Sequence, residues 1–159
     1  MRPTNNFEIG IDYSLYNVEA EQWALQNAGS TYPDLSQEQI KTIRQAVAKF
    51  IKKSGFTVGD VAKILRKYFD EERAFLIART EITRAYAYSS QIEGEKTKKE
   101  YPDVRVTKTW LTCNDDQVCE VCGSLHEKEV DINKPFAEGV FIPPAHEGCR
   151  CSISSSTRI

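Results

Sequence analysis

The chain has 159 residues, of which 40% are hydrophobic and 28% charged, and its formal net charge at pH 7 is −2. This length fits one compact domain with an appended arm and a modest core. No apolar run approaches the roughly 18 residues of a membrane span, and a protein that wraps nucleic acid alone is usually basic overall. Composition therefore argues against a membrane protein and gives no bulk support to a nucleic-acid-wrapping protein.

The first 34 residues predict an arm followed by a short helix. Apolar and polar residues alternate along residues 7–15, a period of two that indicates a short strand or an extended arm. A loose helical stripe then runs through residues 15–28, and Gly29 ends it. We therefore place a boundary at residue 34, before a longer domain over residues 35–159.

The first half of that domain, residues 35–91, is predicted to be helical. Ser36 and Gln39 form a capping-box pattern at the start of a helix over residues 37–54. Gly55 ends this helix, and Thr57 caps a second, shorter one. The two are expected to pack as an antiparallel pair.

A third helix is predicted from about residue 70 to residue 91, with Arg79, Thr80 and Glu81 in its middle. Glu81 and Arg84 lie three residues apart, so their side chains can pair. The simpler interpretation is a solvated charge pair on the helix surface. The alternative buries Glu81 beside the cysteine-rich part of the chain, where it would hydrogen-bond to the loops.

The second half is predicted to contain short strands. Mixed charges in residues 92–105 indicate a solvated connector or hinge. Alternating residues predict a strand over 104–112, and further strand candidates lie at 128–132 and 140–142. The Ser-rich tail, 152–159, is expected to be frayed. We expect an α+β fold, with a helical N-terminal half and a small antiparallel, zinc-stapled C-terminal half over residues 104–153.

The stretch from Asp115 to Cys151 holds four of the five cysteines and both histidines. It contains a C-x-x-C and, further on, an H-x-x-C, and each can place two ligands on one metal ion from a single turn. Two such half-sites are typical of a structural zinc site, because sulfur and nitrogen ligands favour Zn²⁺ over hard cations. Five candidates compete for about four positions: Cys119, Cys122, His146, Cys149 and Cys151.

Other interpretations of the cysteines remain open from the sequence. Disulfides or free thiols are the main alternative, although nothing resembling a secretory signal opens the chain. Cys113 has a poor chelating spacing and is expected to be a bystander. His126 is expected to form hydrogen bonds and is the reserve ligand. Arg150, between two cysteines, is expected to point away from the metal and to clamp Asp115 or Asp116 with two hydrogen bonds.

A catalytic zinc site is less well supported. Such a site needs an open coordination position and a nearby general acid or base. Glu147 follows His146 directly, but the zinc deaminase signature places its H-x-E before the P-C-x-x-C, and here the order is reversed. With four or more soft ligands available, a closed structural site is the simpler hypothesis.

Three blocks of sequence carry a family resemblance: "ARTEITRAY" (78–86), "TWLTCNDDQVCEVCGSLHEKEV" (109–130) and "IPPAHEGCRCSI" (142–153). In order and spacing they resemble the Mu F-like minor head protein family of tailed bacteriophages and prophages, over about residues 35–155. The first block alone is weak, whereas the second and third together are specific. Cys113 departs from the family, which more often has a small residue at that position.

The resemblance implies a non-enzymatic minor capsid protein that acts in head morphogenesis. Such proteins are present in few copies inside the prohead, associate with the portal protein and are linked to DNA packaging or delivery. The implied location is the phage head interior or the bacterial host cytoplasm, the implied cofactor is a structural Zn²⁺, and DNA is a possible partner. The resemblance also favours a buried, structural role for Arg79 and Glu81.

Two functions from other classes compete with this interpretation. The first is a zinc-containing enzyme or effector domain that acts on nucleic acid or a nucleotide, with three protein ligands and a water on the metal. The second is a free-standing zinc-bound DNA-binding module, which should show a Lys/Arg patch and steep salt dependence. The sequence has no dense basic cluster near the ligands, which weighs against this last function.

Overall fold

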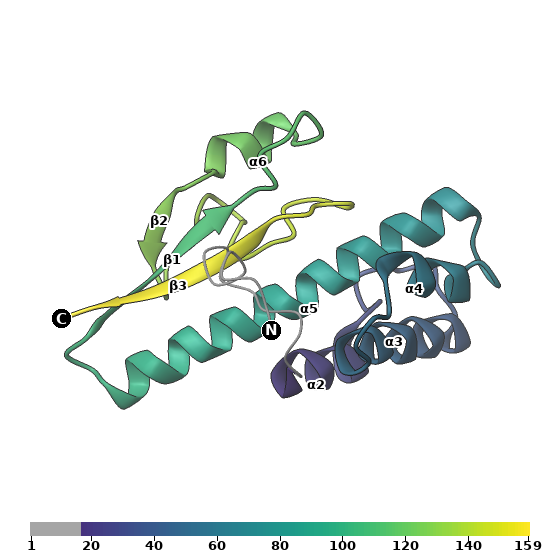
Figure 1. Cartoon of the computed structure of the whole chain (residues 1–159), viewed down its shortest axis with the longest axis horizontal. Helices are drawn as coiled ribbons and strands as arrows, with labels where there is room; N and C mark the ends of the chain where they lie inside the picture. Colours follow the sequence, from purple (N-terminus) through teal and green to yellow (C-terminus); the bar gives the residue numbers. More distant parts are fainter. Residues whose placement is uncertain (1–16) are drawn as a thin grey trace.

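The computed structural model describes residues 17–159, so the predicted arm over residues 7–15 lies outside the described residues. The order of elements is α2 (Val18–Asn27), α3 (Gln37–Lys52), α4 (Val58–Leu65), α5 (Glu71–Glu100), β1 (Arg105–Leu111), α6 (Glu120–Leu125), β2 (Glu129–Asp131) and β3 (Ser152–Arg158). The fold is α+β, with a helical N-terminal half and a small antiparallel sheet in the C-terminal half (Figure 1).

The helix starts follow the capping signals in the sequence. The side chain of Ser36 accepts a hydrogen bond from the Gln39 backbone N–H, and the Gln39 side chain accepts one from the Ser36 N–H. Thr57 and Asp60 form a second capping box at the start of α4. These reciprocal bonds satisfy backbone donors that a helix start leaves free, so both predicted helix starts are confirmed.

The third helix is longer than predicted, because α5 continues from Glu71 to Glu100. The expected connector over residues 92–105 is therefore wrong for most of its length. Mixed charges suggested a hinge, but Gly94 is buried in the helix, and a Cβ atom there would lie 2.5 Å from Ile132 Cδ1. The missing side chain lets the second half of α5 pack closely against the C-terminal half of the protein.

The sheet has three antiparallel strands in the order β2-β1-β3. The first two predicted strands are confirmed, but the third is not at residues 140–142, where Val140 forms only an isolated bridge with Ala137. The third strand is instead β3, in the tail expected to be frayed. It pairs with β1 along its whole length, and its serines and threonine lie mostly on an exposed surface, which is why its sequence reads as a loop.

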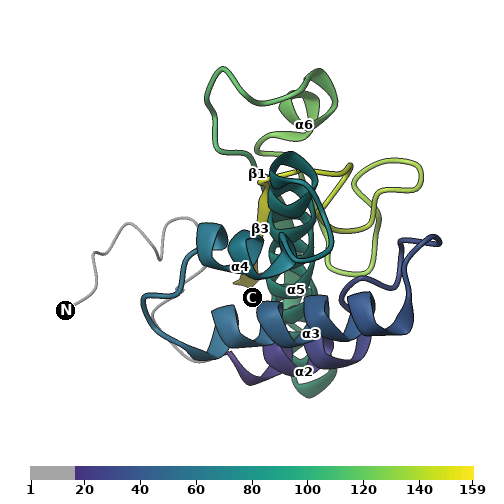
Figure 2. The same cartoon turned by 90° about the vertical axis from the view of Figure 1, so that its right-hand side faces the viewer.

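Helix α5 separates two hydrophobic cores. On one side α2, α3 and α4 pack against it around Ile43, Val47 and Ile77, and on the other side lie the sheet and α6 (Figures 1 and 2). The second core is small and contains Trp110 stacked edge-on against Phe136, together with three cysteines. No helix within residues 17–159 is long and apolar enough to cross a membrane.

Candidate metal centre

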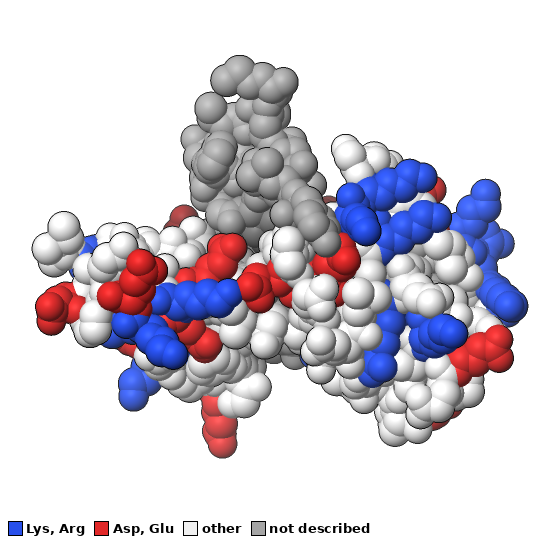
Figure 3. Space-filling view, turned by 90° about the horizontal axis from the view of Figure 1, so that it is seen from below, with Lys and Arg blue, Asp and Glu red and all other residues white. Residues whose placement is uncertain are grey.

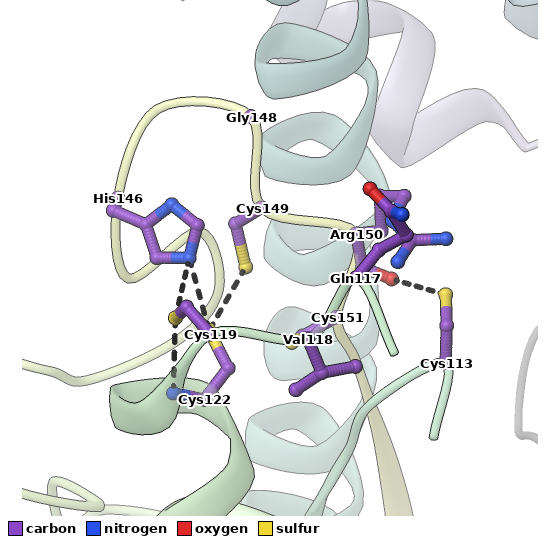
Figure 4. Close-up of a pocket in the computed structure, with 10 residues that line it drawn as sticks. All are labelled: Cys113, Gln117, Val118, Cys119, Cys122, His146, Gly148, Cys149, Arg150 and Cys151. Carbon is purple, nitrogen blue, oxygen red and sulfur yellow. Dashed lines mark hydrogen bonds between the residues drawn. The ribbon is translucent and has the colours of Figure 1, made fainter. Parts of the chain in front are cut away.

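Four side chains from the two half-sites meet at one end of the second core. Cys119 caps the start of α6, and Cys122 lies in its first turn. The Nε2 atom of His146 lies 3.1 Å from the sulfur of Cys119 and 3.1 Å from that of Cys122, and the sulfur of Cys149 lies 3.9 Å from that of Cys122 (Figure 4). Tetrahedral coordination of one Zn²⁺ ion requires ligand atoms within about 3–4 Å of one another, because Zn–S and Zn–N bonds measure about 2.3 and 2.0 Å. The donors of Cys119, Cys122 and His146 form one close group of this kind, and Cys149 meets the spacing toward Cys122, so the residue types and these distances fit Zn²⁺.

The imidazole of His146 presents the correct nitrogen. Its Nδ1 atom lies 2.8 Å from the backbone carbonyl of Glu147. A carbonyl oxygen only accepts hydrogen bonds, so Nδ1 carries the proton and the lone pair of Nε2 faces the sulfur atoms of Cys119 and Cys122. A hydrogen bond that fixes the second ring nitrogen is usual for histidines that bind metal ions.

The protonation of the thiols is unequal in the bare protein. Burial raises the pKa of Cys122 to about 12, whereas the hydrogen bond from the side chain of Cys151 lowers the pKa of Cys149 to about 5. A backbone N–H donated by Cys122 lowers the pKa of Cys119. Metal binding requires thiolates. A dication at the centre would stabilise the thiolate of Cys122 and so offset the effect of burial on its pKa.

The other possible metal ligands, Cys151, Cys113 and His126, lie in different surroundings. Cys151 is buried and belongs to a second close group with Cys122 and Cys149. Cys113 is exposed and donates a hydrogen bond to the Arg150 carbonyl, so it stands apart from both groups. The Nδ1 atom of His126 lies 3.1 Å from the backbone N–H of Thr112, which agrees with the prediction of a hydrogen-bonding histidine.

Two threonines of α5 fix the loop that carries His146 and Cys149. The hydroxyl of Thr80 accepts a 2.7 Å hydrogen bond from the backbone N–H of Gly148, and the hydroxyl of Thr83 donates a 2.9 Å bond to the carbonyl of Cys149. Thr83 was not singled out in the sequence. The available signal was its spacing of three from Thr80, which places both hydroxyls on one helix face.

Glu81 is buried, as the second interpretation expected, but its partners differ. Its carboxylate accepts hydrogen bonds from the backbone N–H of Gly29 at 2.6 Å and from Arg84 at 2.9 Å. The expectation that Glu81 binds the cysteine-rich loops is therefore wrong: Glu81 faces the loop after α2, and its neighbour Thr80 faces the metal loop. Arg79 lies half-exposed with its guanidinium 4.7 Å from the ring centre of Phe75.

Arg150 links the two half-sites without a metal ion. Its guanidinium donates two hydrogen bonds to the carboxylate of Asp115, at 2.9 and 2.7 Å. The Arg150 hydrogen bond lowers the pKa of Asp115. Asp116, the other expected partner, is exposed. The predicted bidentate clamp is thus formed, and it joins the loop before α6 to the segment that leads into β3.

The space at the centre is small. The cavity lined by the cysteines, His146 and Arg150 has a volume of about 30 Å³. A single water needs roughly 10–15 Å³ by the same measure, so this space can admit an ion or a water molecule. The arrangement can bind a metal ion and cross-link chain segments.

Comparison with known proteins adds one match. A family model described as "Phage Mu protein F like protein" matches residues 40–154. No curated protein and no solved structure matches the chain.

Proposed function

Since the chain belongs to the Phage Mu protein F like family, which suggests a head morphogenesis protein, we propose that it is a minor head protein with a structural zinc ion. In this proposal the ion binds Cys119, Cys122, His146 and Cys149. The observation that carries the proposal is the convergence of the two half-sites, because His146 Nε2 lies 3.1 Å from both sulfurs of the C-x-x-C.

The zinc ion would act as a cross-link between segments that have little apolar contact of their own. The half-sites lie on α6 and on the loop before β3, and the second core that connects them is small. Metal binding would add the free energy that this part of the chain cannot obtain from burial. The result would be a rigid surface of loops and α6 beside the sheet.

We assign the fourth ligand to Cys149 and not to Cys151. The sulfur of Cys149 lies 3.9 Å from that of Cys122, which is close to the separation of two thiolates on one tetrahedral zinc ion. The loop to Cys149 is also fixed by Thr83 through the carbonyl of that cysteine. Cys151 then serves as a buried thiol beside the ligand set.

In this role the protein would do no chemistry at the metal. It would act in the phage head, in contact with the portal protein or other head proteins, during assembly and DNA packaging or delivery. The small size of the cavity, about 30 Å³, supports a structural site. The rigid surface held by the metal ion would provide the contacts to these partners.

The first experiment is metal analysis of the purified chain followed by cobalt substitution. One zinc ion per chain, and a cobalt spectrum of a tetrahedral site with three thiolates, would support the structural site. Absence of bound metal would contradict it and leave the cysteines as free thiols or disulfides. A cobalt site with an exchangeable water would favour the zinc enzyme instead.

The head-protein role needs a separate test. We expect the chain to co-purify with the portal protein when both are produced in one cell, and a Cys119→Ser/Cys122→Ser variant to lose this association if the metal-held surface makes the contact. A variant with both serines that associates as well as the wild type would show that the contact lies elsewhere.

A further inference from the structure

Positive charge is concentrated in one part of this acidic chain. Residues 41–68 contain eight lysines and arginines and a single acidic residue, Asp60. The whole chain nevertheless has a net charge of −2, so the remainder carries a clear excess of negative charge. Overall composition hides this separation, which is why the net charge of the whole chain did not support nucleic-acid binding.

Seven of these eight side chains are exposed on α3, α4 and the turns that follow them. We call this group the basic surface, and its members are Lys41, Lys49, Lys52, Lys53, Lys63, Arg66 and Lys67. Figure 3 shows Lys and Arg side chains gathered at the end of the molecule formed by α3 and α4, whereas both signs mix at the opposite end. The basic surface therefore belongs to the end of the molecule that α3 and α4 form.

The charges of the basic surface are free to meet a ligand. None of its seven side chains forms a salt bridge with a residue in the described range 17–159. Asp60 is engaged in capping α4, and Glu71 and Glu72 lie at the edge, where they line a hollow with Lys63 and Arg66. Free, exposed cations of one sign attract a polyanion strongly at low ionic strength.

Helix electrostatics explain only part of the pattern. Lys49 and Lys52 lie in the last turn of α3 and Lys63 in the last turn of α4, where a cation stabilises the helix dipole. Lys41 lies in the first half of α3, and Arg66 and Lys67 follow the end of α4, so this effect does not require all of them. Lys49 and Lys53 also both lie over the ring of Phe56, at 5.0 and 5.9 Å from its centre.

We propose that the basic surface binds the phosphate backbone of double-stranded DNA without sequence preference. Six of its seven members are lysines, and lysine is a compact point charge suited to phosphates in varied positions. Recognition of carboxylates on an acidic protein favours the paired donors of arginine, and the basic surface contains only Arg66. The choice of duplex DNA as the polyanion rests on the proposed role in a phage head.

The basic surface is separate from the candidate metal centre, since it lies on α3 and α4 and the metal ligands lie beyond residue 118. DNA binding and metal binding can therefore be tested independently. In a head protein, this arrangement would let one end of the molecule contact packaged DNA while the metal-held surface contacts a protein partner.

The test measures binding of a fluorescent duplex of about 20 base pairs by anisotropy, between 50 and 200 mM salt. Two variants remove parts of the basic surface: Lys49→Gln/Lys52→Gln/Lys53→Gln and Lys63→Gln/Arg66→Gln/Lys67→Gln. The control removes the same charge from exposed positions elsewhere, with Lys99→Gln/Arg105→Gln/Lys134→Gln. Circular dichroism and metal content show whether each variant remains folded with its site intact.

We expect the wild type to bind with a steep salt dependence. Each basic-surface variant should lose roughly tenfold or more in affinity, and its slope of log K against log salt should fall by up to about 2.7, at about 0.9 per lost phosphate contact. The control variant should keep the affinity and the salt slope of the wild type. Equal losses in the control, or absence of binding by the wild type, would overturn the proposal.

A competition with polyglutamate tests the other kind of partner. Preference of the wild type for polyglutamate over DNA would overturn the proposal in favour of an acidic protein. A further outcome is a chain that holds one zinc ion and associates with the portal protein but fails to bind DNA. That result would refute only the proposal that the basic surface binds DNA. The proposed head function would then stand.

Discussion

The hydroxyl of Thr80, in the middle of α5, accepts a 2.7 Å hydrogen bond from the backbone N–H of Gly148, in the loop between two candidate metal ligands. The same hydroxyl donates to the carbonyl of Leu76. Gly148 has a φ angle of +82°, and a Cβ atom there would lie 3.0 Å from Leu76 Cδ2. Helix and loop are thus in direct contact, so the helical half positions the loop that carries the candidate ligands His146 and Cys149.

Replacement of Thr80 by Val keeps the shape of the side chain and removes the acceptor. The backbone N–H of Gly148 would then lose its partner at a part-buried position, which should reduce the free energy of unfolding by about 1–3 kcal/mol. Urea denaturation of the zinc-loaded protein measures the change. Thr97→Val is the matched control, because the hydroxyl of Thr97 bonds only within α5 and is exposed. Equal stability of the two variants would contradict this role for Thr80.

Substitution of Cys149 and of Cys151 should affect metal affinity differently, and the difference shows which of them is the fourth ligand. If Cys149 is the fourth ligand, Cys149→Ser should weaken zinc binding by more than about a hundredfold. Cys151→Ser should act as the loss of a neighbour of the ligands, in the range of about 10–100-fold or less. Competition with a chromophoric chelator measures both. The opposite ranking would assign Cys151 to the metal.

The clamp between Arg150 and Asp115 calls for a double-mutant cycle at neutral pH. We expect Arg150→Gln and Asp115→Asn each to lower the melting temperature, because each leaves one partner of a bidentate pair alone. The double variant should be little less stable than either single variant. Asp116→Asn is the control, since this neighbouring carboxylate is exposed and outside the clamp. Additive effects of the two substitutions would show that the pair does not interact.

The tail strand should matter for stability although its sequence suggested fraying. Ile153 is fully buried and pairs with Trp110 across β1 and β3. Ile153→Ala should therefore reduce the free energy of unfolding by about 2–5 kcal/mol, measured by urea denaturation. Ile159→Ala provides the comparison, because Ile159 is exposed at the end of the chain. A tail that is frayed in solution would make the two variants equally stable.

The buried side chain of Lys108 should make the stability of the protein depend on pH. It is fully buried in β1, where its ammonium donates hydrogen bonds to Gln91 and to the carbonyl of Phe141, yet burial lowers its pKa to about 8. Between about pH 8 and the usual pKa near 10.4, the unfolded chain holds this proton and the native protein does not. Stability should therefore rise with pH across this window, relative to a variant that cannot titrate.

The measurement compares urea midpoints of the wild type and Lys108→Met at pH 7 and pH 10. We expect the stability of the wild type relative to the variant to increase at the higher pH. Other titrating groups, including the thiols, are common to both proteins and cancel in the difference. Lys134→Met, at an exposed position, should show no such trend. A constant difference across the two pH values would show that the pKa of Lys108 is not lowered.

Several features could be predicted from local sequence because local chemistry decides them. The capping boxes at Ser36 and Thr57 act within three residues, and they mark helix starts in any context. The half-sites around Cys119 and His146 depend on short spacings that survive folding. The partner of Arg150 could be predicted only to one of two neighbouring carboxylates, because Asp115 lies 35 positions away and the fold decides which carboxylate the guanidinium meets.

Other features were decided only by tertiary structure. Residues 92–100 are helical and Ser152–Arg158 forms a strand because each packs on a partner far along the chain, α5 through Gly94 against Ile132 and β3 along β1. Glu81 faces Gly29 while Thr80 faces Gly148, a division that spacing alone could not assign. Local rules thus determined the helix starts and the candidate ligands, and long-range packing determined which groups meet.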